Sequence, residues 1–231
     1  MNTLVVLQPG YLPWLGFFDQ LVRSDIFVYY DDVQFDKHGW RNRNRIKSPN
    51  GPHWLTVPVL NKGKFGQTNL DVEIDNRQSW ARKHIATIRQ FYAKSPYLKL
   101  YLPELEDVLL SRWNNLVELD LAVVDLMCIW LKIKRKIVRS SELGVTGTQS
   151  KRLLRFCQHF GATNYLSGDS AINYLDVDLF ASSGIRIEWQ KFSHPVYPQL
   201  HGEFVPYLSA LDMILNMGEK GCEILTDRVR V

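Results

Sequence analysis

Short continuous apolar runs alternate with a helical pattern over the first thirty residues of the chain. Thr3–Leu7 is a β-branched and aliphatic run that stops at a Pro-Gly turn, as a buried strand does. Apolar side chains then recur at helical spacing over Trp14–Arg23, and Ile26–Tyr30 is a second continuous apolar run. The order strand, helix, strand predicts a right-handed crossover between two parallel strands of one sheet.

The middle of the chain is dominated by helical periodicity. Before it, Trp54–Leu60 predicts a strand in which Pro58 favours an edge position or a bulge. Three helices are then predicted, over Ser79–Tyr92, Leu102–Leu110 and Leu116–Leu131. We expect these helices to form a helical layer or insertion at about residues 77–133.

Strand and helix patterns alternate again toward the end of the chain. The predicted strands are Lys136–Ser140, Asn164–Leu166 and Ile185–Gln190, and the predicted helices are Ser150–Phe160, Tyr174–Ser182 and Leu208–Met217. No repeat, low-complexity tract or linker divides the sequence. We therefore predict one α/β domain over residues 1–231, with a Rossmann-like, mostly parallel sheet flanked by helices and a largely helical middle segment.

The composition excludes several classes of protein. With 45% hydrophobic and 23% charged residues, the chain has ordinary globular usage. It has neither a stretch of about 18 uncharged apolar residues nor a signal-peptide pattern, which predicts a cytoplasmic protein without membrane insertion. The net charge of +4 is mild, so we expect no nucleic-acid partner. The cysteines, widely spaced among apolar residues, predict buried free thiols rather than a metal site.

Five basic residues cluster in Asp31–Lys47, directly after the second predicted strand. Ligands of open α/β sheets bind at the carboxyl ends of strands, so a site is expected here. If residues 40–47 are extended, alternate side chains share a face: Arg41, Arg43 and Arg45 on one, Asn42 and Asn44 on the other. Three guanidinium groups on one face suit bidentate contact with phosphates. The alternative is a solvated basic edge strand that resists aggregation.

The same segment holds two candidate general bases. Asp31 and Asp32 point to opposite sides of an extended chain, so one can face a substrate while the other caps a turn. We favour Asp32 as the base, since a carboxylate can take the proton of an attacking amine or hydroxyl. His38, which titrates near neutrality, is the other candidate. Gln34 and Trp40 complete the substrate-binding residues of this segment.

Three other places offer groups to a substrate. The turn after the first strand carries aromatic rings that either stack on a base or sugar or simply pack. The turn after the strand at 164–166 offers backbone N–H groups to an anion. Near the end of the chain, an aspartate in an apolar helix pattern either reaches the cleft or lies on the exposed face. The residues concerned are Gln8, Tyr11 and Trp14, then Ser167 and Gly168, then Tyr197, Gln199 and Asp212.

Several motifs together resemble the WbqC-like protein family. They are Gln8-Pro9 with Tyr11, Pro13-Trp14 and Gly16, then Asp31-Asp32-Val33-Gln34-Phe35, Trp40-Arg41-Asn42-Arg43-Asn44-Arg45-Ile46, Trp54-Leu55-Thr56-Val57-Pro58-Val59 and Tyr165-Leu166-Ser167-Gly168. The resemblance implies an enzyme of bacterial surface-polysaccharide (O-antigen) biosynthesis. It implies a transferase that attaches an aminoacyl group, such as glycyl, or an acyl group to the amino group of a nucleotide-linked amino sugar. It further implies an acyl carrier protein whose phosphopantetheine thioester supplies the acyl group. Independently, the sequence has no Walker-type loop, dinucleotide fingerprint, Gly-x-Ser-x-Gly elbow or His-Glu-x-x-His motif, which predicts no tightly bound cofactor.

The opening of the chain is also similar to that of pantothenate synthetases, which activate a carboxylate with ATP on a Rossmann-like fold. In that family two histidines bind the triphosphate, and Pro13 and Gly16 stand in their places here. The similarity thus implies the fold while arguing against activation by ATP. Two alternatives to the transferase stay open: an ATP-dependent carboxylate-amine ligase and a non-catalytic nucleotide-sugar binding module.

Overall fold

A computed structural model describes residues 2–37 and 39–226 of the chain. Contacts between residues divide the chain into two compact units, each assembled from separate stretches of sequence. Unit 1 consists of Met1–Gln8, Gly16–Asp32 and Arg135–Ser193, and unit 2 of Pro9–Leu15, Val33–Lys134 and His194–Val231. The chain thus leaves unit 1 and returns to it, and a single domain over residues 1–231 stays a prediction.

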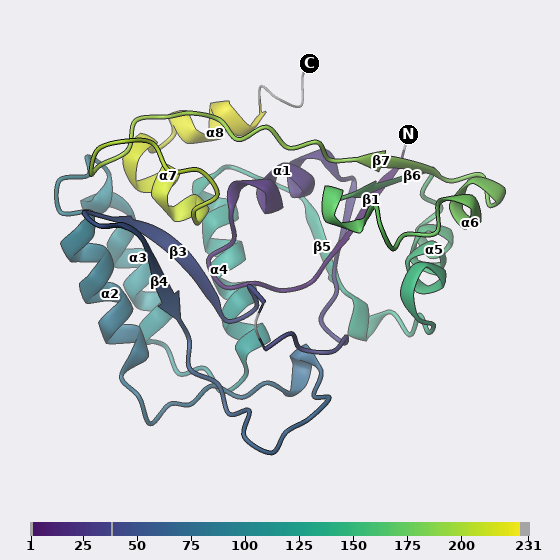
Figure 1. Ribbon diagram of the computed structural model, residues 1–231, viewed down its shortest axis with the longest axis horizontal. Helices are drawn as coiled ribbons and strands as arrows, with labels where there is room; N and C mark the ends of the chain where they lie inside the picture. Colours follow the sequence, from purple (N-terminus) through teal and green to yellow (C-terminus); the bar gives the residue numbers. More distant parts are fainter. Residues whose placement is uncertain (1, 38, 227–231) are drawn as a thin grey trace. The chain divides into compact units, whose positions relative to one another are not determined.

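Unit 1 contains a five-stranded sheet in the order β5-β2-β1-β6-β7 (Figure 1). Its strands are β1 (Thr3–Leu7), β2 (Ile26–Tyr29), β5 (Lys136–Arg139), β6 (Asn164–Ser167) and β7 (Arg186–Trp189). Every neighbouring pair is parallel. The predicted Rossmann-like α/β fold with a parallel sheet flanked by helices is therefore confirmed.

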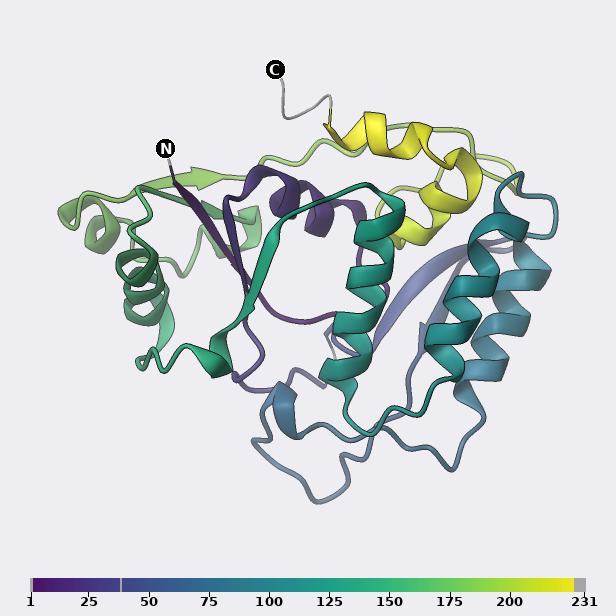
Figure 2. The same ribbon diagram turned by 180° about the vertical axis from the view of Figure 1, so that it is seen from behind.

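Helices cover the two faces of this sheet. On one face, α1 (Leu15–Arg23) places the Phe17 ring 5.2 Å from the Phe27 ring of β2. The other face packs against α5 (Gln149–Phe160) and α6 (Val177–Ser182), which contact each other (Figure 2). The chain moves along the sheet in one direction from β1 to β5 and in the other from β6 to β7. Right-handed crossovers then put the two sets of helices on opposite faces.

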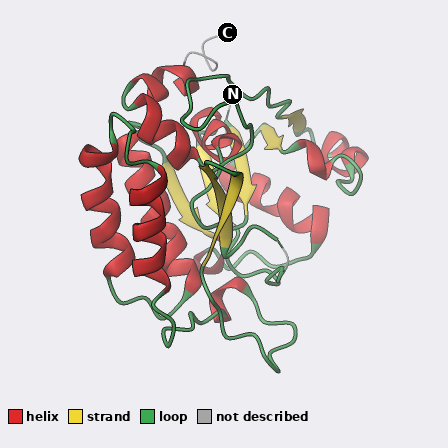
Figure 3. Ribbon diagram, turned by 60° about the vertical axis from the view of Figure 1, so that its left-hand side comes forward, coloured by secondary structure: helices red, strands yellow, loops and turns green. Residues whose placement is uncertain are grey.

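Unit 2 combines a two-stranded antiparallel sheet with helices. The hairpin is made of β3 (Arg43–Ser48) and β4 (Gly51–Thr56). The helices are α2 (Trp80–Phe91), α3 (Leu98–Leu110), α4 (Leu116–Trp130), α7 (Ala210–Met217) and α8 (Lys220–Thr226). Within this unit α2 packs on α3 and α3 on α4 (Figure 3). The largely helical middle segment is thus confirmed.

Some predicted boundaries were wrong. The strand predicted over Trp54–Leu60 begins at Gly51 and ends at Thr56. One further bond in the same register, from the Val57 N–H to the Asn42 carbonyl, follows before Pro58, which has no N–H to give. Helix α8 was not predicted, since it is short and carries Gly221 in its first turn. The one-turn 3-10 helices η1 (Asn69–Asp71), η2 (Ser140–Glu142) and η3 (Asp169–Ala171) complete the elements.

Two global features bear on function. Because the sheet of unit 1 is parallel, the carboxyl ends of its strands lie at one edge, and the strand order reverses between β1 and β6. Such a switch point is the usual ligand position in open α/β sheets. Among the helices of the described residues, none has both the length and the apolar character needed to cross a membrane.

Candidate functional site

The hairpin of unit 2 carries two arginines packed against two tryptophans. The guanidinium carbon of Arg43 lies 4.6 Å from the Trp54 ring centre, and that of Arg45 lies 5.2 Å from the Trp40 ring and 5.6 Å from the Trp54 ring. The two indole rings are 5.0 Å apart and are 44% and 43% exposed. We call these four residues the arginine–tryptophan face.

The strand register produces this face. Arg45 pairs with Trp54 and Arg43 with Thr56, so the side chains of Arg43, Arg45 and Trp54 project from one side of the hairpin, and that of Asn44 projects from the other. Trp40 joins them from the loop that precedes β3. The guanidinium group of Arg45 forms no ion pair with any described residue. Its Nε is a buried donor that has no hydrogen-bond acceptor among the described residues. A cation of this kind, next to exposed indole rings, can bind an anion joined to a flat ring.

Arg41 does not belong to this face. Strand β3 begins at Arg43, so the expectation that residues 40–47 are extended throughout was wrong. Arg41 lies in the preceding loop, where its Nη1 donates to the Pro9 carbonyl at 2.7 Å and its own carbonyl accepts from Tyr11 N–H at 3.0 Å. These bonds hold the loop against the turn after β1, so the arginine points away from the predicted row.

The asparagines of the segment bind backbone rather than solvent. Asn42 Nδ2 donates to the Val57 carbonyl at 2.7 Å, and Asn44 Nδ2 donates to the Leu12 carbonyl at 2.8 Å. Both residues are buried. Gln34 is exposed and forms an isolated antiparallel bridge with Thr68. The predicted substrate contacts of all three stay a prediction, and the bonds of the two asparagines give them a structural role.

The aromatic turn after β1 is packed. Tyr11 is fully buried; its hydroxyl lies 3.0 Å from His84 Nδ1, and its ring makes an edge contact with Trp80. This burial counts against a stacking role for Tyr11. Trp14 is half-buried, with its ring centre 5.8 Å from that of Tyr207. The structure therefore favours the packed-turn alternative for Tyr11.

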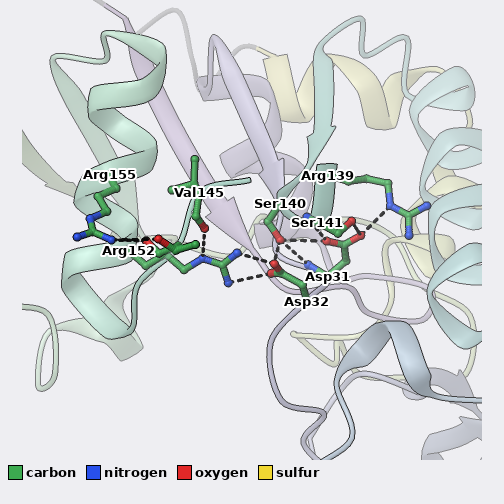
Figure 4. Close-up of polar contacts among 9 residues, drawn as sticks. Asp31, Asp32, Arg139, Ser140, Ser141, Val145, Arg152 and Arg155 are labelled. Atoms are coloured by element: carbon green, nitrogen blue, oxygen red, sulfur yellow. Dashed lines mark hydrogen bonds and ion pairs between the residues drawn. The ribbon is translucent and has the colours of Figure 1, made fainter. Parts of the chain in front are cut away.

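The carboxyl ends of β2 and β5 in unit 1 are joined by a polar network (Figure 4). Asp31, fully buried, accepts from Arg139 Nε at 2.7 Å and from Ser141 N–H at 3.0 Å. Asp32 receives both terminal nitrogens of Arg152, at 2.9 and 2.5 Å. Ser140 Oγ lies 3.0 Å from Asp31 Oδ1 and 2.6 Å from Asp32 Oδ1. The two aspartates thus fasten the strand ends to each other and to α5.

This network makes Asp32 a weak base. Burial by itself raises the pKa of Asp32, but the hydrogen bonds from Arg152 and Ser140 outweigh it and hold the pKa below the usual value. A carboxylate held ionised in a bidentate pair accepts a proton less readily. Its assignment as the catalytic base stays a prediction that this pair disfavours. His38, the other predicted base, lies outside the described residues.

The switch point of unit 1 brings together two of the predicted positions. Leu4 pairs with Tyr165, so the register carries Gln8 and the Ser167-Gly168 turn to the same edge, beyond β1 and β6. Gln8 Oε1 is buried without a hydrogen-bond partner among the described residues. A Cβ on Gly168 would lie 3.5 Å from Gln20 Nε2, so the turn runs close to α1. Anion binding by this turn stays a prediction.

Near the end of the chain, the predicted Tyr197, Gln199 and Asp212 form one buried cluster in unit 2. Asp212 Oδ2 accepts from Tyr197 Oη at 2.9 Å and from Gln199 Nε2 at 2.8 Å, while Oδ1 accepts from Tyr92 Oη at 2.6 Å. Asp212 is fully buried rather than on an exposed face, and burial raises its pKa although the three donors act against the shift. The cluster anchors residues 197–199 to α7.

Comparison with known proteins identifies the family. A profile of the WbqC-like protein family matches residues 8–224. The uncharacterized protein Rv1507c of Mycobacterium tuberculosis is 34% identical over 227 residues, which cover 97% of this chain and 98% of that protein. The chain belongs to the WbqC-like protein family. No solved structure matches the chain.

Membership of the WbqC-like family applies to both units, because the matched residues include the parallel sheet of unit 1 and the hairpin of unit 2. The arginine–tryptophan face and the strand-end network therefore both lie within the part of the chain that carries the family pattern.

Several residues of these sites were missed in the sequence. Trp54 completes the arginine–tryptophan face. The Pro49-Asn50 turn followed by Gly51, between two strand-like runs, is a hairpin signal that predicts its pairing. Arg152 left no local signal, since its partner Asp32 lies far away in the chain. The same holds for Asp120 in α4, whose carboxyl is fully buried.

Proposed function

We propose that this WbqC-like protein is a transferase of bacterial surface-polysaccharide biosynthesis. It attaches an aminoacyl group, such as glycyl, or an acyl group to the amino group of a nucleotide-linked amino sugar. The observation that carries the proposal is the arginine–tryptophan face, where two guanidinium groups lie over two half-exposed indole rings. The family membership is consistent with a biosynthetic role.

The phosphates of a nucleotide sugar and its rings both match groups on this face. Its phosphates accept bidentate hydrogen bonds from guanidinium groups, and Arg45 Nε is a donor without an acceptor among the described residues. Its base or sugar can stack on the exposed indole surface of Trp40 or Trp54. A simple solvated edge needs neither the two aromatic rings nor their pairing with the cations.

The chemistry is an attack of the amine on an activated carbonyl. With a carrier-protein thioester as donor, the new C–N bond forms, the C–S bond breaks, the amine loses a proton and the thiolate takes one up. The protein must hold the amine close to the carbonyl and accept the proton. Asp32 and His38 are the acceptors that the sequence proposes.

The test is incubation of the protein with a panel of nucleotide-linked amino sugars and glycyl- or acyl-carrier protein, followed by mass spectrometry of the sugars. We expect one sugar nucleotide to gain one acyl group. Arg45→Gln and Trp54→Ala should raise KM several-fold, whereas Arg82→Gln, at an exposed position on α2, should not. Absence of product from a folded protein with every pair would contradict the proposal.

Two further readouts separate the alternatives. Isotope exchange between pyrophosphate and ATP that depends on a free acid would instead support the ATP-dependent ligase. A rise in melting temperature with nucleotide sugars, without product from any donor, would support the binding module, since a ligand that binds only the native state stabilises it.

A further inference from the structure

Asp120 is a buried carboxyl group without partners. It lies on α4, is 0% exposed, and neither Oδ1 nor Oδ2 has a hydrogen-bond partner among the described residues. Buried polar atoms in proteins are almost always satisfied, so an unsatisfied carboxyl needs an explanation. Burial raises the pKa of Asp120 well above the usual value, against the opposing effect of Arg41.

A second unpartnered group lies on the element packed beside it. Asn69, which begins η1, is 2% exposed, and both its Oδ1 and Nδ2 lack partners among the described residues. The start of α4 is fixed to η1, because Leu116 N–H donates to the Val72 carbonyl at 2.8 Å (Figures 1 and 2). Asp120 follows Leu116 by one helical turn and shares its face.

Tyr11 adds another acceptor near Asp120. Burial raises the pKa of Tyr11, and a negative charge on Asp120 raises it further. His84 is neutral, since burial lowers its pKa to about 4, and its ring also donates to the Thr56 carbonyl. A neutral imidazole has one N–H, so Nδ1 must accept from the Tyr11 hydroxyl. The Tyr11 oxygen therefore keeps its lone pairs for another donor.

These groups form a set rich in acceptors. Asp120 supplies two oxygens, Asn69 one and Tyr11 one, whereas the donors are the unpartnered amide nitrogen of Asn69 and the O–H that the raised pKa keeps on Asp120. A ligand that satisfies them must bring N–H or O–H donors. Arg41, whose positive charge acts on Asp120, opposes a second full positive charge there. That combination favours an amine in its uncharged form, which has donors for the carboxyl and a lone pair for attack.

We propose that Asp120 and Asn69 line a buried site in unit 2 that binds the primary amine of the substrate. The assignment of that amine to an amino sugar rests on the proposed function, whereas the amine preference of the site does not. Asp120 contacts the amino group in its uncharged form, and a carboxyl oxygen of Asp120 accepts a hydrogen bond from the amine N–H. Asn69 orients the same nitrogen.

The probes are glucosamine, N-acetylglucosamine and glucose, each added without nucleotide or acyl donor, with binding measured by calorimetry and thermal shift. We expect glucosamine to bind wild-type protein at least ten-fold more tightly than the other two sugars. Asp120→Asn should abolish that preference. Asp125→Asn, at an exposed position of the same helix, should keep it.

Stability and a second variant guard against a folding artefact. Because Asp120 has no partner to lose, Asp120→Asn should melt at the wild-type temperature or above it. Should Asp120→Asn fold poorly, Asn69→Leu tests the same site, with the same loss of preference expected. Equal binding of the three sugars by wild-type protein, or an amine preference kept by Asp120→Asn, would overturn the inference. Amine preference without any acyl transfer would instead contradict the proposed function alone.

Discussion

At the scale of single residues, two buried aspartates of unit 2 differ in whether their carboxyl oxygens have hydrogen-bond partners. Asp212 accepts hydrogen bonds from Tyr92, Tyr197 and Gln199. The carboxyl oxygens of Asp120, in the same unit, have no partner among the described residues. A satisfied network stabilises a fold, whereas an unsatisfied group costs stability and points to a ligand. Substitution of Asp212 should therefore lower the stability of the protein, whereas substitution of Asp120 by asparagine should not.

Asp212→Ala should lower the free energy of unfolding by on the order of 3 kcal/mol, because three buried donors lose their acceptor. Tyr197→Phe removes one donor and should cost about 1 kcal/mol. Urea unfolding followed by circular dichroism measures both. A value for Asp212→Ala no larger than that for Tyr197→Phe would show that the cluster does not anchor this part of the chain.

The ion pair of Asp32 should make the stability of the protein depend on pH. Despite burial, its bonds with Arg152 and Ser140 lower its pKa in the folded protein, so the unfolded chain binds more protons at acid pH. The ion pair therefore stabilises the fold above the unfolded-state pKa of about 3.9, and this stability is lost as pH falls through the folded-state value. The stability difference between wild type and Asp32→Asn should shrink from about pH 6 to about pH 3. A constant difference would contradict the assignment.

At the scale of elements, two glycines end helices in conformations that other residues adopt at a cost. Gly161 ends α5 at φ 60°, with open space where a Cβ would lie, so Gly161→Ala should cost about 1 kcal/mol from backbone strain alone. Gly218 ends α7 at φ 55°, and a Cβ there would lie 2.4 Å from the Tyr97 ring. Gly218→Ala should therefore cost clearly more, as thermal unfolding would show. Equal costs would mean that Tyr97 moves freely.

Elements were also the scale at which the sequence was most informative. The strands β1 and β2 and the helices α2 and α4 follow from local periodicity, because burial of one face or of a whole run leaves a mark in neighbouring residues. The arginine–tryptophan face was half predicted: alternation put Arg43 and Arg45 together, but not Trp54, which reaches them only through the hairpin. Arg152 and Asp120 carry no such mark, since their environment is made by distant segments.

At the scale of the whole molecule, the order of the chain explains how the units are built. Strand β5 pairs with β2 although the stretch Val33–Lys134 of unit 2 intervenes. The parallel sheet thus closes only after much of unit 2 has been synthesised. Loop-closure entropy grows slowly with length, so such an insertion is tolerated by the sheet. The single domain that the sequence predicts therefore contains a unit with a separate sheet and helices of its own.

Whole-molecule charge leads to the last prediction, which separates a local site from general electrostatic attraction. The chain has a net charge of +4, so any anionic ligand is attracted to some degree. If the arginine–tryptophan face binds the phosphates of a nucleotide sugar, the affinity should fall several-fold from about 0.02 M to about 0.2 M salt.

The double variant Arg43→Gln/Arg45→Gln should weaken binding of the nucleotide sugar and make its affinity depend less on salt concentration. Arg82→Gln/Lys83→Gln removes the same charge from exposed positions on α2 and should do neither. Quenching of tryptophan fluorescence reports binding directly, because Trp40 and Trp54 lie on the face itself. Equal effects of the two double variants would mean that net charge, and not this face, attracts the ligand.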